Sequence, residues 1–265
     1  MPPAVPLPQD RRYHRVVDVK AAARSWRGTI DARRLSAGAH VRIAFMPLPS
    51  ASTLNLWKRR LGHVPDSVWD RTDLETLVLA DNDLSSVSEQ IGRLKRLHML
   101  DLGHNRLTSV PEGLGDLEGL SDFLYLHDNR LTSLPSSLSR LQRLRYLNIG
   151  ENAFEALPEC VSGMVSLIEL RASDNPIASL PDSLRQLTNL RELHLRNTKL
   201  ETLPESVAAL PQLRQIDLRG NPLRRLPAAL VTLPRLEKLD LRWVDTLELP
   251  VWIADLEARG CVVYR

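Results

Sequence analysis

The chain has 265 residues, of which 43% are apolar, 25% are charged and only 5% are aromatic, so it can bury a core made mainly of aliphatic side chains. This composition excludes a disordered chain, and no apolar run reaches the roughly 18 residues that predict a transmembrane helix. The formal charge of +3 is uneven: residues 1–50 hold nine Lys or Arg and three acids (+6), which leaves 26 bases and 29 acids (−3) for the remainder.

The first 50 residues differ from the rest of the chain. Residues 1–10 hold four prolines and are expected to be a disordered tail. Residues 11–50 are expected to form a basic N-terminal cap, with a short helix over residues 17–26. Within this cap Val41, Ile43 and Phe45 alternate as in a strand, so we expect residues 40–46 to cover the first repeat.

Several features bear on the compartment. The N-terminus lacks the apolar segment of a secretory signal. Cys160 and Cys261 are too few for the disulfide framework of a secreted repeat protein. We therefore expect a reduced, cytoplasmic protein, with signal-independent export to a host cell as an open alternative. Only five of the 35 basic residues are lysines, a bias typical of GC-rich, often bacterial, genomes.

From residue 51 onward the sequence repeats every 23 or 24 residues. The strings LETLVLADNDL, LRYLNIGENAF and LRQIDLRGNPL share one pattern, in which a proline usually follows six residues after an asparagine. The recurring asparagines are Asn82, Asn105, Asn129, Asn152, Asn175 and Asn221. The pattern resembles the leucine-rich-repeat family, in the 23-residue intracellular form of the Ras-group and disease-resistance-type proteins. The resemblance covers residues 51–258, in nine units, and is specific for the fold but not for a function.

This resemblance implies an α/β solenoid, a leucine-rich-repeat horseshoe with a parallel concave β-sheet and short 3-10 or irregular convex segments. Each L-x-L pair alternates as a strand does, and one unit cannot bury its leucines alone, so stability comes from stacking. The inward asparagines are expected to form a structural ladder by bonding to backbone groups of the turns. Thr198 takes the asparagine position in the seventh unit, where its hydroxyl serves in part.

Two irregularities predict local departures from this pattern. The fourth unit has one extra residue near Ser121–Phe123, which predicts a small bulge before residues 124–126. Residues 259–265 are expected to form a C-terminal capping strand, with Val262 and Tyr264 in the positions of the strand leucines.

Outward-facing residues of successive strands should form columns on the concave sheet. One predicted partner-binding patch gathers aromatic and related side chains: Met99, Phe123, Tyr125, His127 and Tyr146. The alternative is that these side chains simply fill surface. A second patch is an arginine ladder with its flanking residues: Arg171, Arg196, Arg219, Arg242 and Trp243. These arginines either pair with Asp217, Asp240 and Glu192 on the same face or dock acidic or phosphate groups of a partner.

The sequence contains no phosphate-binding loop, no Cys/His cluster with metal-ligand spacing and no nucleophile elbow. We therefore expect no catalytic residue, no cofactor, no metal and no small-molecule substrate. The leading hypothesis is a non-catalytic protein-interaction module or adaptor that binds a protein on its concave face. One alternative is binding of nucleic acid or an anionic surface through the basic segment 11–42; another is a delivered bacterial effector that binds a host protein.

Overall fold

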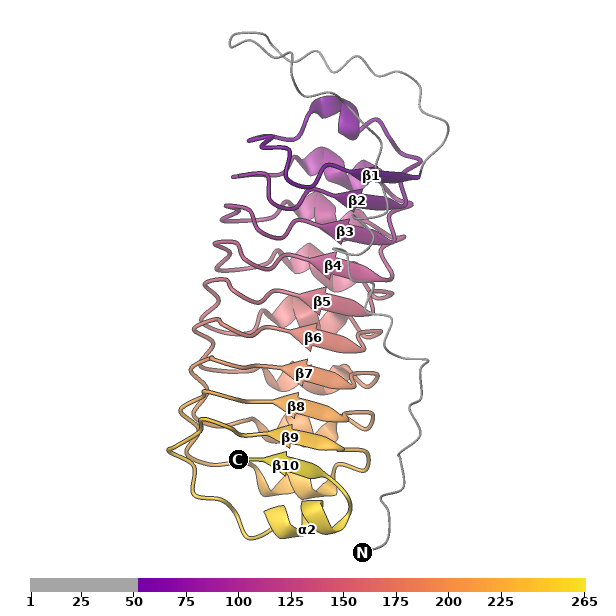
Figure 1. The fold of residues 1–265 in the computed structure, drawn as a ribbon. Helices are drawn as coiled ribbons and strands as arrows, with labels where there is room; N and C mark the ends of the chain where they lie inside the picture. The colour runs from indigo at the N-terminus through magenta and orange to yellow at the C-terminus, as the bar shows by residue number, and fades with distance from the viewer. Residues whose placement is uncertain (1–51) are drawn as a thin grey trace, which may run out of the picture. The chain divides into compact units, whose positions relative to one another are not determined.

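The computed structural model describes residues 52–265, and these form one parallel sheet of ten strands in chain order. The strands are β1 (Thr53–Asn55), β2 (Thr76–Val78), β3 (Met99–Asp101), β4 (Phe123–Tyr125), β5 (Tyr146–Asn148), β6 (Glu169–Arg171), β7 (Glu192–His194), β8 (Gln215–Asp217), β9 (Lys238–Asp240) and β10 (Val262–Tyr264). Figure 1 shows them stacked in order along one side of the described residues. The predictions for residues 1–10, 17–26 and 40–46 lie outside the described residues.

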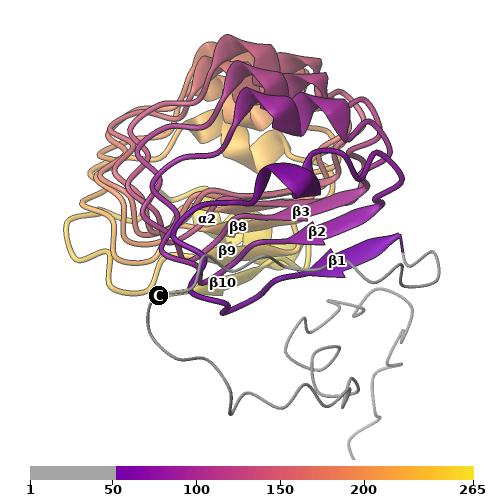
Figure 2. The same cartoon turned by 90° about the horizontal axis from the view of Figure 1, so that it is seen from above.

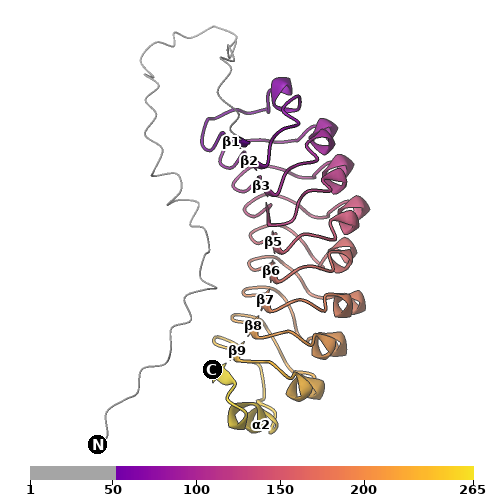
Figure 3. The same ribbon diagram turned by 90° about the vertical axis from the view of Figure 1, so that its right-hand side faces the viewer.

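Short 3-10 helices form the opposite side, as Figures 2 and 3 show, and the sheet lies on the inner side of a gentle curve. They are η1 (Asp66–Val68), η2 (Glu89–Arg93), η3 (Glu112–Asp116), η4 (Ser136–Arg140), η5 (Glu159–Gly163), η6 (Asp182–Gln186), η7 (Glu205–Ala209) and η8 (Ala228–Thr232). The predicted α/β solenoid with a parallel concave sheet and 3-10 convex segments is therefore confirmed. No helix among residues 52–265 is long and apolar enough to cross a membrane.

The strand leucines explain the stacking. Leu77, Leu100, Leu124 and Leu147 pair in register between neighbouring strands, and each is fully buried. Burying one such side chain contributes about 1.5–3 kcal/mol to the stability of the fold. A single repeat cannot bury its leucines without neighbouring repeats. The residues on either side of each leucine face outward and form the columns of the concave face.

The 3-10 helices begin where the sequence supplies a proline. Pro111, Pro135 and Pro181 precede helices with φ between −64° and −73°, the value that the pyrrolidine ring imposes. The second repeat has Ser88 instead, and its hydroxyl accepts a hydrogen bond of 3.2 Å from the N–H of Gln90. A proline and a capping serine thus serve the same turn by different means.

Each ladder asparagine bonds to the backbone of two repeats. The Nδ2 of Asn152 donates to the carbonyls of Ile149 (3.1 Å), Gly150 (3.0 Å) and, one repeat earlier, Leu126 (3.0 Å). Its Oδ1 accepts the N–H of Leu131 at 3.0 Å. Groups that a tight turn would leave unpaired are satisfied in this way.

The seventh repeat shows the effect of changing this residue. Thr198 uses its hydroxyl to donate to Oδ1 of Asn221. A threonine lacks the second donor of an amide, so it replaces only part of the asparagine network.

The extra residue of the fourth unit is accommodated before β4. There the carbonyl of Ser121 accepts the N–H of Arg145, whereas in the sixth unit the carbonyl of Ile168, directly before β6, accepts the equivalent N–H of Arg191. The strand itself stays in register, since Phe123 pairs with both Met99 and Tyr146.

The C-terminus departs from the prediction. β10 is present, but Val263 pairs with the inward Leu239, while Val262 and Tyr264 pair with the outward Lys238 and Asp240. The predicted phase was therefore wrong by one residue. An unpredicted helix, α2 (Ile253–Ala258), precedes the strand, and the route through it sets the phase that the repeat pattern alone could not give.

Candidate functional site

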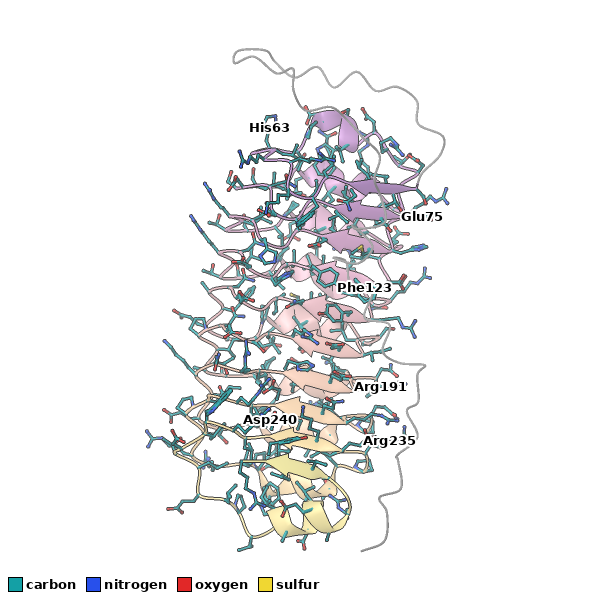
Figure 4. The ribbon with its side chains drawn as sticks, in the orientation of Figure 1. His63, Glu75, Phe123, Arg191, Arg235 and Asp240 are labelled. Atoms are coloured by element: carbon teal, nitrogen blue, oxygen red, sulfur yellow. The ribbon has the colours of Figure 1, made fainter. Side chains whose placement is uncertain are left out.

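Five outward-facing side chains gather on strands β3 to β5 and their first following turn. We call Met99, Phe123, Tyr125, His127 and Tyr146 the aromatic cluster. Met99, Phe123 and Tyr146 are register partners in one column, and Tyr125 lies beside them. The ring centroids of Phe123 and Tyr146 are 5.5 Å apart and those of Tyr125 and Tyr146 are 5.2 Å apart, within the favourable range for aromatic pairs. Figure 4 labels Phe123 on this face of the sheet.

The cluster is half-buried and uncharged. Burial raises the pKa of Tyr125 to about 12, with a smaller contribution from the charge of Asp101. Burial likewise raises the pKa of Tyr146. Both hydroxyls therefore stay protonated near neutral pH, and the cluster offers apolar ring surface together with hydroxyl groups.

His127 extends the cluster over a glycine. A Cβ at Gly103 would lie only 2.5 Å from Cε1 of His127, so the absence of a side chain at position 103 makes room for the imidazole. The ring of His104 packs edge-on at a centroid distance of 4.7 Å. Nδ1 of His127 is buried and has no hydrogen-bond partner among residues 52–265.

The pH dependence of stability should report on His127. Burial, with help from His104, lowers its pKa to about 4, so the unfolded chain binds a proton below about pH 6.5 that the folded chain excludes. The free energy of unfolding should thus fall between about pH 6.5 and pH 4, by about 1–2 kcal/mol for this half-buried ring. Urea denaturation of wild type and His127→Phe across this range should show a shallower loss in the variant; identical slopes would contradict this assignment.

The arginine ladder is neutralised within the face. Arg219 Nε and Nη2 lie 2.8 Å and 2.5 Å from the two carboxylate oxygens of Asp217. Arg242 contacts Asp240 in the same manner, at 2.9 Å and 2.7 Å. Burial opposes ionisation of Asp240, but the hydrogen bonds from Arg242 and the charges of Arg242 and Arg219 together outweigh it and lower the pKa of the carboxyl group. These contacts favour the first interpretation of the ladder, in which the arginines pair with carboxylates on the same sheet face.

The other two arginines also have carboxylate partners. Arg196 Nη2 lies 2.8 Å from Asp174, and Arg171 Nε lies 2.5 Å from Glu169. Glu192, which the sequence suggested as a partner, lies 3.2 Å from Nε2 of His194, and its negative charge also helps to raise the pKa of Arg171. No unneutralised cationic patch is therefore formed by the four arginines.

Trp243 lies at the end of this ladder and is 65% exposed. The guanidinium groups of Arg219 and Arg242 lie 5.9 Å and 5.8 Å from its ring. Its φ of 60° is left-handed, in a turn that other repeats fill with smaller or more permissive residues such as Asp128 and Gly220. Trp243 is separated from the aromatic cluster by several strands, so the sequence-predicted residues form two groups and not one site.

The structure also brings together three potential metal ligands, Glu169, Glu192 and His194, whose ligand atoms lie within 4.8 Å of one another. The register explains the grouping, since Glu169 pairs with Glu192 across β6 and β7. Arg171 already binds Glu169, which opposes a cation at this place. A polar hollow of about 290 Å³ adjoins the group and is lined by Arg171, His194, Arg219 and neighbours.

Comparison with known proteins agrees with the repeat pattern. A family model described as leucine rich repeat matches residues 49–107, 122–177 and 188–243, and a two-copy model of the repeats matches residues 165–207. No curated protein sequence matches the chain.

Three solved structures illustrate the likeness in fold. The leucine-rich-repeat domain of the type III effector XCV3220 (XopL) is 24% identical with a TM-score of 0.70, over 82% of this chain and 77% of that one. The internalin inlF of Listeria monocytogenes is 21% identical with a TM-score of 0.68, over 80% and 60%. The ectodomain of the receptor kinase GASSHO1/SCHENGEN3 of Arabidopsis thaliana is 27% identical with a TM-score of 0.66, over 76% and 25%. The chain thus spans less than two thirds of the internalin and of the receptor ectodomain.

Proposed function

The chain belongs to the leucine-rich-repeat family, and we propose that it is a non-catalytic adaptor that holds a protein partner on its concave sheet. Domains of this family are generally protein–protein interaction modules. The observation that carries the proposal for this chain is the aromatic cluster, because it places Phe123, Tyr125 and Tyr146 in contact with one another on adjacent strands of the concave sheet.

Physical reasons favour the cluster as the centre of an interface. Tyrosine and phenylalanine offer large contact areas at a small entropic cost, and aromatic side chains dominate the binding energy of many interfaces. The rings already pack on one another, so little freedom remains to be lost on binding. The neutralised arginines Arg171, Arg196, Arg219 and Arg242, with Trp243, would supply a polar flank that fixes orientation.

Related complexes give this proposal further support. The GASSHO1/SCHENGEN3 ectodomain was solved in complex with CASPARIAN STRIP INTEGRITY FACTOR 2, and PEPR1, 26% identical with a TM-score of 0.56 over 67% of this chain and 29% of that one, was solved with AtPEP1. The alternative of a delivered bacterial effector gains nothing from the internalin and XopL, whose identities of 21% and 24% show the fold alone.

We propose the reduced cytoplasm as the compartment of action. Cys160 and Cys261 are both buried and unpaired, and burial raises the pKa of Cys160 to about 11, which keeps this thiol unreactive. The basic segment 11–42, on which the alternative of nucleic-acid or anionic-surface binding depends, lies outside the described residues. Steep salt dependence of binding would distinguish that alternative.

Photocrosslinking tests which face binds. We would place p-benzoylphenylalanine at Phe123 on the concave sheet or at Val165, which is 38% exposed and lies two residues after η5, and irradiate each variant in cell lysate. The proposal expects a discrete crosslinked protein from position 123 and none from position 165. Crosslinks only from position 165 would contradict binding on the concave face.

A further inference from the structure

The last residue of the strand hydrogen-bonds to the backbone in several repeats, but its side chain is charged in some repeats and neutral in others. In five repeats the last strand residue uses a side-chain oxygen to accept the N–H of the residue two positions later. These acceptors are Asn55, Asp101, Asn148, Asp217 and Asp240, at N···O distances of 2.9, 2.9, 3.0, 3.2 and 3.4 Å. Since amides and carboxylates both make this bond, the turn itself does not require a negative charge.

Two of the three carboxylates at this position pair with an arginine. Asp217 and Asp240 form two-point contacts with Arg219 and Arg242, each two residues further along the chain. The amides need no such partner: Asn148, for example, is followed at that distance by Gly150. A carboxylate therefore accompanies an arginine, and an amide accompanies an uncharged residue.

Asp101 breaks this correspondence, because it is a carboxylate followed by Gly103. Its side chain accepts the Gly103 N–H, and no Lys or Arg pairs with it among residues 52–265. The residue is only 7% exposed. Desolvation raises the pKa of Asp101, which marks the energetic cost of an unpaired buried carboxylate.

The surroundings of Asp101 belong to the aromatic cluster. Asp101 is the register partner of Tyr125, so the two side chains are neighbours in one column of the sheet. In the same repeat as Tyr125, the ring of His127 covers Gly103, which is the chain position from which an arginine side chain pairs with Asp217 and Asp240 in later repeats. The carboxylate therefore adjoins aromatic faces, which also attract cations.

We propose that Asp101 receives a cationic side chain, a guanidinium or an ammonium group, from the protein partner. The cation would pair with the carboxylate and lie against the ring of Tyr125. This inference rests on the proposed function, because it assigns the chemistry of the partner at the aromatic cluster. The turn does not need the negative charge of Asp101, and burying that charge without a cation destabilises the free protein. A cationic group of the partner would offset this destabilisation on binding.

The free protein should show this cost directly. Asp101→Asn keeps an oxygen for the Gly103 N–H, as Asn148 does for Gly150, and removes the charge. Because the folded-state pKa of Asp101 is raised, the wild type loses stability as pH rises from the unfolded-state pKa through that raised pKa. The variant should melt at or above the wild-type temperature at pH 7, and a clearly lower melting temperature would show that the charge stabilises the fold. His104, His127 and Tyr125 face the same region and are present in both proteins.

The proposal itself is tested with a phage-displayed library of random 12-residue peptides selected on the full chain. Selected peptides are synthesised and their Kd values are measured for wild type, Asp101→Asn and the matched control Asp128→Asn, which removes an exposed carboxylate nearby. We expect Arg or Lys at one fixed position, with binding at least tenfold weaker for Asp101→Asn and within twofold for Asp128→Asn. Replacing that Arg by citrulline, which has nearly the same shape and no charge, should cause a similar loss in wild type alone.

The outcomes separate this inference from the proposed function. Peptides that need Tyr125 and Tyr146 but carry no fixed cation, and that bind Asp101→Asn as well as wild type, would overturn the role of Asp101 and leave the interface in place. Absence of any peptide that depends on Tyr125 and Tyr146 would overturn both. A double variant, Gly103→Arg with His127→Ala, supplies an internal arginine and should weaken binding of the cationic peptides well beyond the effect of His127→Ala alone.

Discussion

Alanine at both Tyr125 and Tyr146 is expected to weaken binding of the protein partner by about 100-fold or more. Central aromatic residues of an interface contribute about 2 kcal/mol or more each on truncation, and about 2.8 kcal/mol corresponds to a 100-fold change in Kd. The two rings lie 5.2 Å apart at the centre of the aromatic cluster, so both should contact the same part of the partner. Isothermal titration calorimetry with the partner identified by crosslinking measures the change.

Controls separate binding from folding. The strand leucines beneath the cluster are fully buried and unchanged by this substitution, so melting should fall by only a few degrees, from lost ring contacts. Tyr264→Ala is the matched control, since it removes a 42% exposed tyrosine from the same sheet face on β10. An equal loss of affinity in Tyr264→Ala, or none in the double variant, would move the interface away from the cluster.

Asn105→Ala is expected to lower the free energy of unfolding by about 3 kcal/mol, since unsatisfied buried groups cost about 1–3 kcal/mol. Nδ2 of Asn105 donates to the carbonyls of Leu79 (3.1 Å), Leu102 (3.0 Å) and Gly103 (3.0 Å). Its Oδ1 accepts the N–H groups of Asn82 (3.1 Å) and Leu84 (3.0 Å). Asn152→Ala, at a half-buried site with fewer bonds, should cost roughly 1–3 kcal/mol.

Urea denaturation gives this free energy, and Asn189→Ala provides the control. Asn189 is an exposed asparagine whose amide donates to a single carbonyl, that of Val165 at 3.0 Å. Its substitution should change stability by less than about 0.5 kcal/mol. A similar small change for Asn105→Ala would show that water replaces the ladder bonds and that the asparagines do not hold the turns.

The fold could be predicted because the leucines that produce it recur at a regular spacing. Leucines such as Leu100, Leu124 and Leu147 recur every 23 or 24 residues and pair in register, so one phase determines the inward and outward side of strands β1 to β9. The columns containing Phe123 and Tyr146 follow from that phase alone. Even the extra residue of the fourth unit was visible as a change of spacing, and it leaves the register intact.

The phase was not predictable where the repeat ends. Helix α2 and the turn at Gly260 replace the usual path between strands, so the position of Val263 against Leu239 depends on tertiary packing. Counting from the last repeat placed Val262 and Tyr264 inward, but both face outward.

The chemistry of the face was predictable only in part. Sequence columns identify which residues are neighbours, but side-chain conformation decides which of them pair. Arg171 binds Glu169 in its own strand, and Arg196 reaches Asp174 in the preceding repeat. The unpaired state of Asp101 became visible only by comparison with Asp217 and Asp240, although the glycine two residues later was a signal in the sequence.

Hydroxyl-radical footprinting of the chain with and without its crosslinked partner tests the concave-face interface most directly. Oxidation of Met99, Phe123, Tyr125 and Tyr146 should fall on binding, while the exposed aromatic residues Trp57 and Tyr264 serve as internal references. We predict protection confined to the aromatic cluster and its flank at Trp243, with Trp57 unchanged. Unchanged oxidation of the cluster in a saturated complex would contradict binding at this face.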